Sequence, residues 1–568
     1  MNKCIKYIKQ NLILTGSLII IVVVYLYHLD KYNLLYHLGD EFGYWANAAF
    51  MSGFDWSGVA SHNTYYSFGY SFVLAPLFLI DNFELRYQAA LILNIFFQII
   101  SFLLLNGISK RLFKQINRNL SYIISLCITL YTSNVFYSKT TLCESFIYFV
   151  FIWIIYLVIK ICTENKWIEY ILLGILTPLI FSIHMRALGI VVSVGLFLII
   201  EYVTNPGSRK KVIVFILETI ILFTVVFFYK NHLIESLYAS NETVATNDFS
   251  GQTGKIELLF SIKGIWLMIR SIIGKVYYLL SASFLIFAWS ILWMKEQIVK
   301  KNGYTVKIAF FFLTSFLFTL GISSLYMIGE SNIIDNLIYG RYNDFIIGPF
   351  LLLGCGYLVE KRNTSVKQYM LIVILYLLAA LFVMINFDKI TNPSIREANI
   401  VGISYLSYNG ETCLYNNWEV VITLKVMVVS VITFILLKRN RLYFKFCTFI
   451  AIGFIWLYGG IQLLDYQLHY RENYYTNRNI YDYLNQNDIY EITYLMNNNY
   501  VYFDSLRPDI LQYMNPHLQI NYKNIDNILL ENERIFFVKK ERFSDSEFRK
   551  YTCVAKSNDF ELYIKNNL

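Results

Sequence analysis

The stretch LILTGSLIIIVVVYLY (residues 12–27), followed by HLGDEFGY (residues 37–44), sets the class of this chain. The first part is a nearly unbroken apolar run, and about 20 such residues in a helix cross a hydrocarbon core about 30 Å thick. Lys3, Lys6 and Lys9 precede the run, and no small-residue cleavage site follows it. We therefore expect an uncleaved signal anchor with the N-terminus in the cytoplasm.

The composition agrees with a membrane protein. The chain has 568 residues, of which 57% are hydrophobic and 15% charged, and its mean hydropathy is +0.47. A soluble globular protein carries about 25% charged residues. The net charge is +9, but the basic residues lie between apolar runs and form no single patch. This pattern indicates membrane lipids as partners and argues against nucleic acid.

Further apolar runs raise the expected number of transmembrane helices to about thirteen. Basic clusters fall in every second loop, and the positive-inside rule assigns these loops to the cytoplasm. We therefore expect a multi-pass protein of the cell (plasma) membrane. The expected spans are residues 12–27, 86–107, 119–136, 143–161, 168–183, 187–203, 212–229, 276–294, 308–328, 342–359, 368–386, 418–437 and 446–464.

Two parts are expected along the chain. Residues 1–465 form the transmembrane part, and residues 466–568, which are polar, form a small α/β domain outside the membrane. The long outer loops are expected at 28–85, 230–275 and 387–417. Within the polar part a helix is predicted at 475–486, and strands at 490–495, 500–503, 535–539 and 559–564. Cys413 and Cys553 both fall outside the membrane, where they either pair or stay free.

Two adjacent carboxylates, Asp40 and Glu41, follow the first span. Asp40 is placed to cap a short helix running through Tyr44, and the helix N-terminus would hold its direction. In a half-dry site such a carboxylate can act as a base toward a hydroxyl or an amine. The alternative is that Asp40 only caps a helix beside a solvated loop.

Several other polar residues are predicted on the same outer face. Arg341 opens a span, where it either snorkels to lipid phosphates or binds the phosphate of a substrate. Arg186 and His184 lie in a tight hairpin, for which interfacial anchoring is the alternative. Glu144 is placed about one turn inside the membrane, where a carboxylate is usually paired or functional. Its expected partner is Lys139 or Arg186.

Carboxylates and cations around a cavity at membrane level suit a lipid-phosphate substrate. The carboxylate would deprotonate an acceptor, and the cations would stabilise the departing phosphate. The sequence has no P-loop, D-x-D pair, His/Cys cluster or G-x-S-x-G elbow, so it does not support an ATPase, a tightly held metal or a serine hydrolase. No metal site is predicted, although surface carboxylates can bind a divalent cation weakly.

Four local patterns, together with the overall plan, carry a resemblance to a known family. The patterns are GDE (39–41) with Tyr44, YYSFGY (65–70) with APL (75–77), RALG (186–189), and GRY (340–342) with Pro349. With them the chain resembles the GT-C superfamily of polyprenyl-phosphate-sugar-dependent glycosyltransferases, especially its protein mannosyltransferase and aminoarabinose transferase-like branch. The second pattern lacks the double proline common in relatives, which bears on the identity of donor and acceptor.

The resemblance implies an all-α polytopic membrane fold of GT-C type and an inverting transfer of a sugar from a polyprenyl-phosphate donor. The acceptor would be a lipid, a glycan or a protein outside the cytoplasm, and no cofactor beyond the lipid-linked sugar is implied. Asp40 is the expected base, with Glu41 in support. The expected phosphate-binding residues are Arg341, Arg186, Lys275 and Tyr342. The expected cavity residues are Tyr44, Tyr66, Lys139, Glu144 and His184.

Two other functions fit parts of the same pattern. A transporter or flippase of lipid-linked saccharides would often show inverted repeats and polar groups at mid-membrane, whereas this sequence has no visible repeat and its polar groups gather at one face. A polymerase or ligase of surface polysaccharide would use a lipid-diphosphate donor. Assays with defined donors would distinguish it from a glycosyltransferase that uses a polyprenyl-phosphate sugar.

Overall fold

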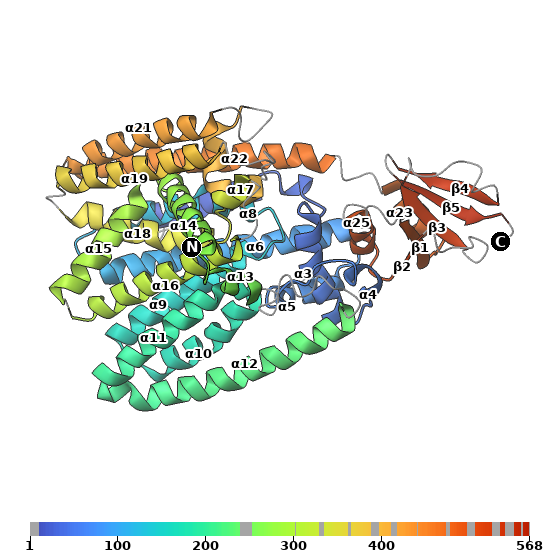
Figure 1. The fold of residues 1–568 in the computed structure, drawn as a ribbon, viewed down its shortest axis with the longest axis horizontal. Helices are drawn as coiled ribbons and strands as arrows, with labels where there is room; N and C mark the ends of the chain where they lie inside the picture. Colours follow the sequence, from blue (N-terminus) through green and yellow to red (C-terminus); the bar gives the residue numbers. More distant parts are fainter. Residues whose placement is uncertain are drawn as a thin grey trace, which may run out of the picture.

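The computed structural model shows a long bundle of helices with a small β-sheet domain at one end (Figure 1). It describes residues 11–238, 253–301, 303–328, 334–361, 365–387, 397–409, 417–439, 441–472, 478–496, 506–524, 534–539, 550–557 and 560–566. Cys413 and the strand predicted at 500–503 lie outside the described residues. The helical bundle and the small sheet domain confirm the predicted all-α polytopic membrane fold with a small C-terminal sheet domain.

Within the described ranges, ten helical segments are long and apolar enough to cross a membrane. They are built on α2 (Leu12–Leu26), α6 (Phe83–Leu112), α9 (Glu144–Thr163), α11 (Leu188–Thr204), α12 (Arg209–Leu237), α14 (Ile262–Ala282), α16 (Thr305–Tyr326), α19 (Val366–Phe387), α21 (Trp418–Lys438) and α22 (Leu442–Glu472). Shorter helices of the bundle are α7 (Arg118–Thr129), α8 (Thr132–Tyr137), α10 (Trp167–Ile183), α15 (Ile286–Lys300) and α18 (Asp344–Glu360). The expected count of thirteen spans is not confirmed.

Two expected spans are interrupted in the structure. The run at 119–136 is divided between α7 and α8, because the backbone of Tyr131 is extended (φ −57°, ψ 139°). The run at 276–294 is divided between α14 and α15, where Phe284 and Leu285 adopt positive φ angles of 48° and 64°. Hydropathy averaged over a whole span does not reveal such breaks, because apolar residues predominate on both sides of them.

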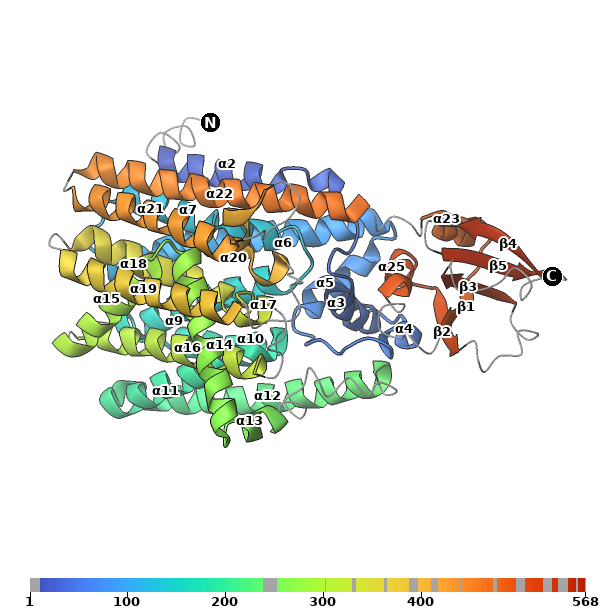
Figure 2. The same cartoon turned by 45° about the horizontal axis from the view of Figure 1, so that its top comes forward.

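The loops that carry the basic clusters, which the sequence assigns to one side of the membrane, meet at one end of the bundle. Arg111 pairs with Glu164, and Lys307 pairs with Glu201 at 2.6 Å. The backbone N–H of Gln115 donates to Glu360 at 3.0 Å. The opposite end carries α3 (Leu38–Met51), α4 (Ser57–Ala60), α5 (Ser71–Leu74) and η2 (Ala75–Leu79), and it faces the sheet domain (Figure 2).

The sheet has the strand order β2-β1-β3-β5-β4. Its strands are β1 (Glu491–Met496), β2 (Gln519–Asn524), β3 (Ile535–Lys539), β4 (Tyr551–Lys556) and β5 (Phe560–Lys565). β1 pairs in parallel with β2 and β3, whereas β5 is antiparallel to β3 and β4. The helix predicted at 475–486 is present as α23 (Arg478–Gln486), and three of the predicted strands correspond to β1, β3 and β5.

Helix α25 (Leu506–Met514) lies between the sheet and the bundle and joins the two (Figure 1). The ring of Tyr513 packs on Trp45 of α3 with centroids 5.1 Å apart. Asn63 donates to the carboxylate of Asp509 at 2.9 Å, and the Trp56 indole donates to the carbonyl of Pro516 at 3.0 Å. The sheet domain therefore rests directly on the segment between α2 and α6.

The remaining short elements are connectors. They are α13 (Thr253–Leu258), α17 (Ile334–Leu337), α20 (Val401–Ser404), η1 (Leu29–Lys31), η3 (Met185–Ala187), η4 (Pro206–Ser208), η7 (Glu397–Asn399) and η8 (Tyr405–Ser407).

Candidate functional site

Glu41, not Asp40, satisfies the backbone at the start of α3. The helix begins at Leu38 with His37 as its N-cap, so Asp40 lies inside the first turn. The carboxylate of Glu41 accepts the backbone N–H groups of Tyr36 and His37, each at 2.9 Å. The sequence-based expectation that Asp40 caps the helix is therefore wrong, because the helix starts three residues earlier than expected. Glu41, one position beyond the N3 residue of a capping box, satisfies the same N-cap backbone N–H by reaching back to it.

Glu41 also ties α3 to two other segments. Its second oxygen accepts from the Tyr87 hydroxyl at 2.8 Å and from the backbone N–H of Thr141 at 2.9 Å. The Thr141 hydroxyl donates to the same oxygen. The side chain is completely buried, so a full set of donors compensates the cost of burying its charge.

Asp40 projects instead toward Arg341. Its Oδ2 lies 2.5 Å from Nη1 of Arg341, and its Oδ1 accepts from the Tyr66 hydroxyl at 2.5 Å. The carboxylate is 31% exposed, while the arginine is 8% exposed. Burial by itself would raise the pKa of Asp40, but the Arg341 charge and the Tyr66 hydrogen bond hold that pKa below its ordinary value. Asp40 is therefore ionised in this state.

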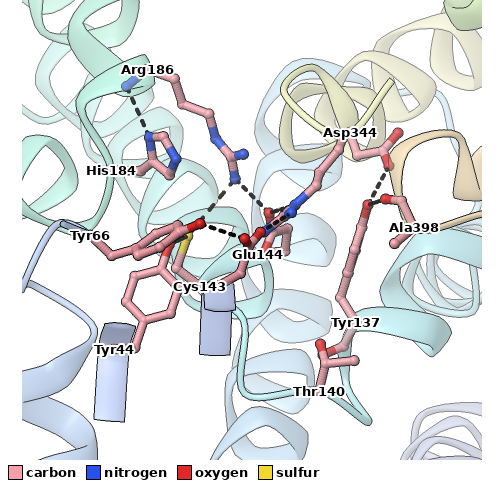
Figure 3. Close-up of polar contacts among 12 residues, drawn as sticks. Tyr44, Tyr66, Tyr137, Thr140, Cys143, Glu144, His184, Arg186, Asp344 and Ala398 are labelled. Atoms are coloured by element: carbon pink, nitrogen blue, oxygen red, sulfur yellow. Dashed lines mark hydrogen bonds and ion pairs between the residues drawn. The ribbon is translucent and has the colours of Figure 1, made fainter. Parts of the chain in front are cut away.

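Glu144 joins two arginines at the start of α9. Its Oε1 accepts from Nε of Arg341 at 2.6 Å and from Nη2 of Arg186 at 3.1 Å. Of the two partners considered for Glu144, the structure selects Arg186 rather than Lys139. Figure 3 shows Arg186 extending from the hairpin of His184 toward Glu144. All three charged groups are almost fully buried, which requires the pairing observed.

Aromatic rings surround the buried Arg186. Its guanidinium lies over the ring of Tyr342, 5.0 Å from the centroid, in the geometry of a cation–π contact. The Tyr342 ring is 5.6 Å from the ring of His184, and Nδ1 of His184 accepts the backbone N–H of Arg186 at 3.2 Å. Within the described part of the chain, Nε and Nη1 of Arg186 are buried without a hydrogen-bond partner. Arg186 thus keeps donors for a further acceptor.

Tyr44 and Tyr66 complete the wall beside Asp40. Their rings lie 5.5 Å apart, and the Tyr44 hydroxyl donates to the sulfur of Cys143 at 3.0 Å (Figure 3). The geometry therefore gathers most of the residues singled out from the sequence. The gathered residues are Asp40, Tyr44, Tyr66, Glu144, His184, Arg186, Arg341 and Tyr342.

Lys139 and Lys275 are not joined to this cluster. The ammonium of Lys139 donates to the carbonyl of Tyr25 at 2.6 Å and lies over the ring of Tyr32. Lys275, in α14, donates to Ser271 at 2.7 Å. The contacts found for the two cations go to other residues, and a place for either of them in the cavity stays a prediction. Membrane sidedness fixes the depth of a residue but not its position around the bundle.

Two neighbours of the cluster were not singled out from the sequence. His37 is adjacent to Asp40 and Arg341; burial, and then the Arg341 charge, lower its pKa to about 4, so its imidazole is neutral at pH 7. Asp344 follows Arg341 closely and accepts from the Tyr278 hydroxyl at 2.6 Å. His37 stands within the quoted stretch HLGDEFGY, and Asp344 follows the quoted GRY by two residues, so this proximity was the available signal. No group of three or more metal-ligating side chains occurs among the described residues.

The ten long apolar helices and the small sheet domain define a multi-pass membrane protein, with the charged cluster at one end of its helical bundle. The structure is similar to crystal structures of ArnT from Cupriavidus metallidurans. With undecaprenyl phosphate bound, the TM-score is 0.54 at 11% identity, over 97% of each chain. In the apo state the TM-score is 0.54 at 10% identity, over 97% of this chain and 98% of that one.

The apo oligosaccharyltransferase of Archaeoglobus fulgidus matches with a TM-score of 0.45 at 9% identity, over 93% of this chain and 69% of the other. No protein-family model and no curated protein matches the sequence. At these identities the likeness shows the fold alone. That fold is the one implied by the resemblance found in the sequence.

Proposed function

We propose that this protein is an inverting glycosyltransferase that moves a sugar from a polyprenyl-phosphate donor to an acceptor outside the cytoplasm. The observation that carries the proposal is the convergence of Asp40, Arg341, Glu144 and Arg186 at one end of the bundle. One partly exposed carboxylate stands there beside two arginines. A base and an anion-binding group within one site are what such a transfer needs.

In this mechanism Asp40 accepts the proton of the acceptor hydroxyl or amine. The acceptor atom attacks the anomeric carbon from the face opposite the phosphate, so the configuration inverts. The bond between that carbon and the phosphate oxygen breaks, and the phosphate leaves with the electron pair. A positioned base contributes roughly 10²–10⁴-fold to such a rate.

Arg341 and Arg186 are proposed to hold the donor phosphate. Arginine offers five N–H donors in a fork that matches phosphate oxygens, and two buried donors of Arg186 have no partner among the described residues. Tyr342 stacks under Arg186 and would keep its plane fixed. Support also comes from the fold shared with ArnT, which was crystallised with undecaprenyl phosphate. Lys275, whose ammonium donates to Ser271, has no role in this proposal.

The proposed orientation places the N-terminus in the cytoplasm and the sheet domain outside the cell membrane. The division proposed is a transmembrane part, residues 1–465, and an outer domain, residues 466–568. It is supported by the basic loops, which meet at the end of the bundle far from the sheet. The acceptor, whether lipid, glycan or protein, would then reach Asp40 from the outer side, beneath the sheet domain.

The test is a transfer assay with purified protein in lipid nanodiscs. A panel of polyprenyl-phosphate sugars is supplied with a membrane extract as acceptor, and release of polyprenyl phosphate is followed. We expect release that depends on the acceptor, that Arg186→Gln abolishes, and that Arg209→Gln leaves unchanged. Arg209 is an exposed residue at the other end of the bundle. Movement of intact lipid-sugar across a vesicle bilayer without release would contradict the proposal and identify a flippase.

A further inference from the structure

Arg341 is shared between two carboxylates that differ in exposure. Its Nε bonds Glu144, which is 4% exposed, and its Nη1 bonds Asp40, which is 31% exposed. A ligand arriving from outside therefore meets the Asp40 side of the guanidinium first. The Glu144 side is enclosed and holds Arg341 in place.

Each oxygen of Asp40 accepts one bond in this state. One of its oxygens accepts from Tyr66 and the other from Arg341. A general base must direct a lone pair at the proton that it removes. The Arg341 cation against one oxygen, together with the Tyr66 hydrogen bond, lowers the pKa of Asp40, so this carboxylate is a weaker base than one released from Arg341.

The charges of the cluster are balanced without any substrate. Asp40 and Glu144 carry two negative charges, and Arg341 and Arg186 carry two positive ones. The groups in contact with or beside Asp40 are Arg341, Tyr66 and His37. A phosphate that enters adds an anion, and the more exposed carboxylate is the one that can give way to it.

We infer that Asp40 occupies the place of the donor phosphate on Arg341 in the resting protein, and that binding of the lipid phosphate displaces it and frees the base. The inference rests on the proposed function and concerns the same site. Donor binding and base release are then one event, so an acceptor is not deprotonated before a donor is present. Asp40 is a built-in competitor of the substrate.

The charges and the proton of the transfer step can be followed around Arg341. The bound donor is a phosphodiester with one negative charge, and Asp40 is a carboxylate. The acceptor proton passes to Asp40, which becomes neutral, and the new bond to the anomeric carbon forms. The bond from that carbon to the phosphate oxygen breaks, and the phosphate keeps the electron pair and gains a second charge. Negative charge is therefore lost on one side of the site and gained at the phosphate that Arg341 holds.

The experiment measures binding of undecaprenyl phosphate to the purified full-length protein in detergent. Asp40→Asn removes the competing charge. We expect its Kd to be roughly 3–30-fold lower than that of wild type, which centres on about a tenfold change in binding constant. The matched control is Asp30→Asn, which removes the same charge from an exposed position in the first outer loop. We expect the Kd of Asp30→Asn to equal that of the wild-type protein. An Asp40→Asn Kd equal to or above the wild-type value would overturn the inference.

A second measurement separates displacement from a long-range charge effect. Infrared difference spectra of the wild-type protein, with and without undecaprenyl phosphate, should show a shifted carboxylate band that is missing in Asp40→Asn. Tighter binding by the variant without that band would overturn displacement. If Asp40→Asn does not fold, the wild-type spectrum decides alone, because a spectrum without any carboxylate change also overturns the inference.

The transfer assay distinguishes failure of this inference from failure of the proposed function. If wild type transfers sugar while Asp40→Asn binds the phosphate no more tightly, the function stands and the displacement is wrong. If wild type neither binds undecaprenyl phosphate nor releases it from a donor, the proposed function itself is wrong.

Discussion

Nη1 of Arg341 lies 2.5 Å from Oδ2 of Asp40, although the two residues are 301 positions apart in the chain. The contact joins the first turn of α3 to the segment just before α18. It therefore exists only when the helical bundle is assembled. The same arginine reaches Glu144 at the start of α9, so three distant segments meet at one guanidinium.

Asp40→Asn should leave the fold intact and reduce sugar transfer. The amide keeps the shape of the side chain and an oxygen for Tyr66, but it cannot take up the acceptor proton. We expect kcat to fall about 10²–10⁴-fold, measured as polyprenyl phosphate released per unit time. Asp30→Asn is the control. Wild-type rates in Asp40→Asn would remove Asp40 as the base.

Replacing Glu41 should affect stability before chemistry. Its carboxylate accepts bonds from Tyr36, His37, Tyr87 and Thr141, and each hydrogen bond to a charged group contributes roughly 1.5–3 kcal/mol. Glu41→Ala leaves these donors buried without partners, so we expect a loss of several kcal/mol and a clear drop in Tm in detergent. The Tm of Glu41→Gln should lie between those of wild type and Glu41→Ala. A Glu41→Ala protein with wild-type Tm and no transfer would instead give Glu41 a chemical role.

The sequence was sufficient for the membrane class and for much of the site. Long apolar runs and alternating basic loops placed Asp40, Arg186 and Arg341 on one face, and the structure brings them together through Glu144. Lys139 was placed on the same face by the same argument, yet it contacts the end of α2 instead. Topology gives depth in the membrane, whereas lateral position depends on helix packing that one sequence does not reveal.

Other features depended on backbone geometry that residue type does not report. The break at Phe284 and Leu285 has no Gly or Pro to signal it, and both residues are apolar. The structural role of Glu41 was likewise hidden, because its donors come from Tyr87 and Thr141, far along the chain. Adjacent carboxylates look alike in a sequence, but helix geometry turns Glu41 inward and Asp40 toward Arg341.

The buried carboxyl of Asp509 should make the junction with the sheet domain pH-dependent. Burial raises its pKa well above the ordinary value, and the Asn63 hydrogen bond only partly opposes this. The folded protein thus holds a proton that the unfolded chain, with a pKa of about 3.9, releases. The free energy of unfolding should therefore fall as pH rises from about 4 through the folded-state pKa, by up to about 1.4 kcal/mol per unit.

Asp509→Asn tests this expectation. The amide oxygen can still accept from Asn63, and the group no longer titrates. Thermal melts of both proteins at pH 5 and pH 8 should show a Tm difference in favour of Asn that grows with pH. A difference that is the same at both values would mean that Asp509 is not protonated in the fold.

Gly58→Ala should loosen the sheet domain from α4 and the segment around it. A Cβ at this position would lie 2.3 Å from the carbonyl oxygen of Ile520 in β2, a contact with backbone that cannot simply rotate away. Overpacking of this kind costs about 1–3 kcal/mol, and α4 must move away from the strand to relieve it. Gly195→Ala is the matched control, because nothing lies within 4 Å of its Cβ position. We expect Gly58→Ala, and not Gly195→Ala, to speed proteolytic release of the sheet domain while the helical bundle stays resistant. Equal cleavage of the two variants would show that α4 does not hold the domain, and that α25 alone fixes it above Asp40.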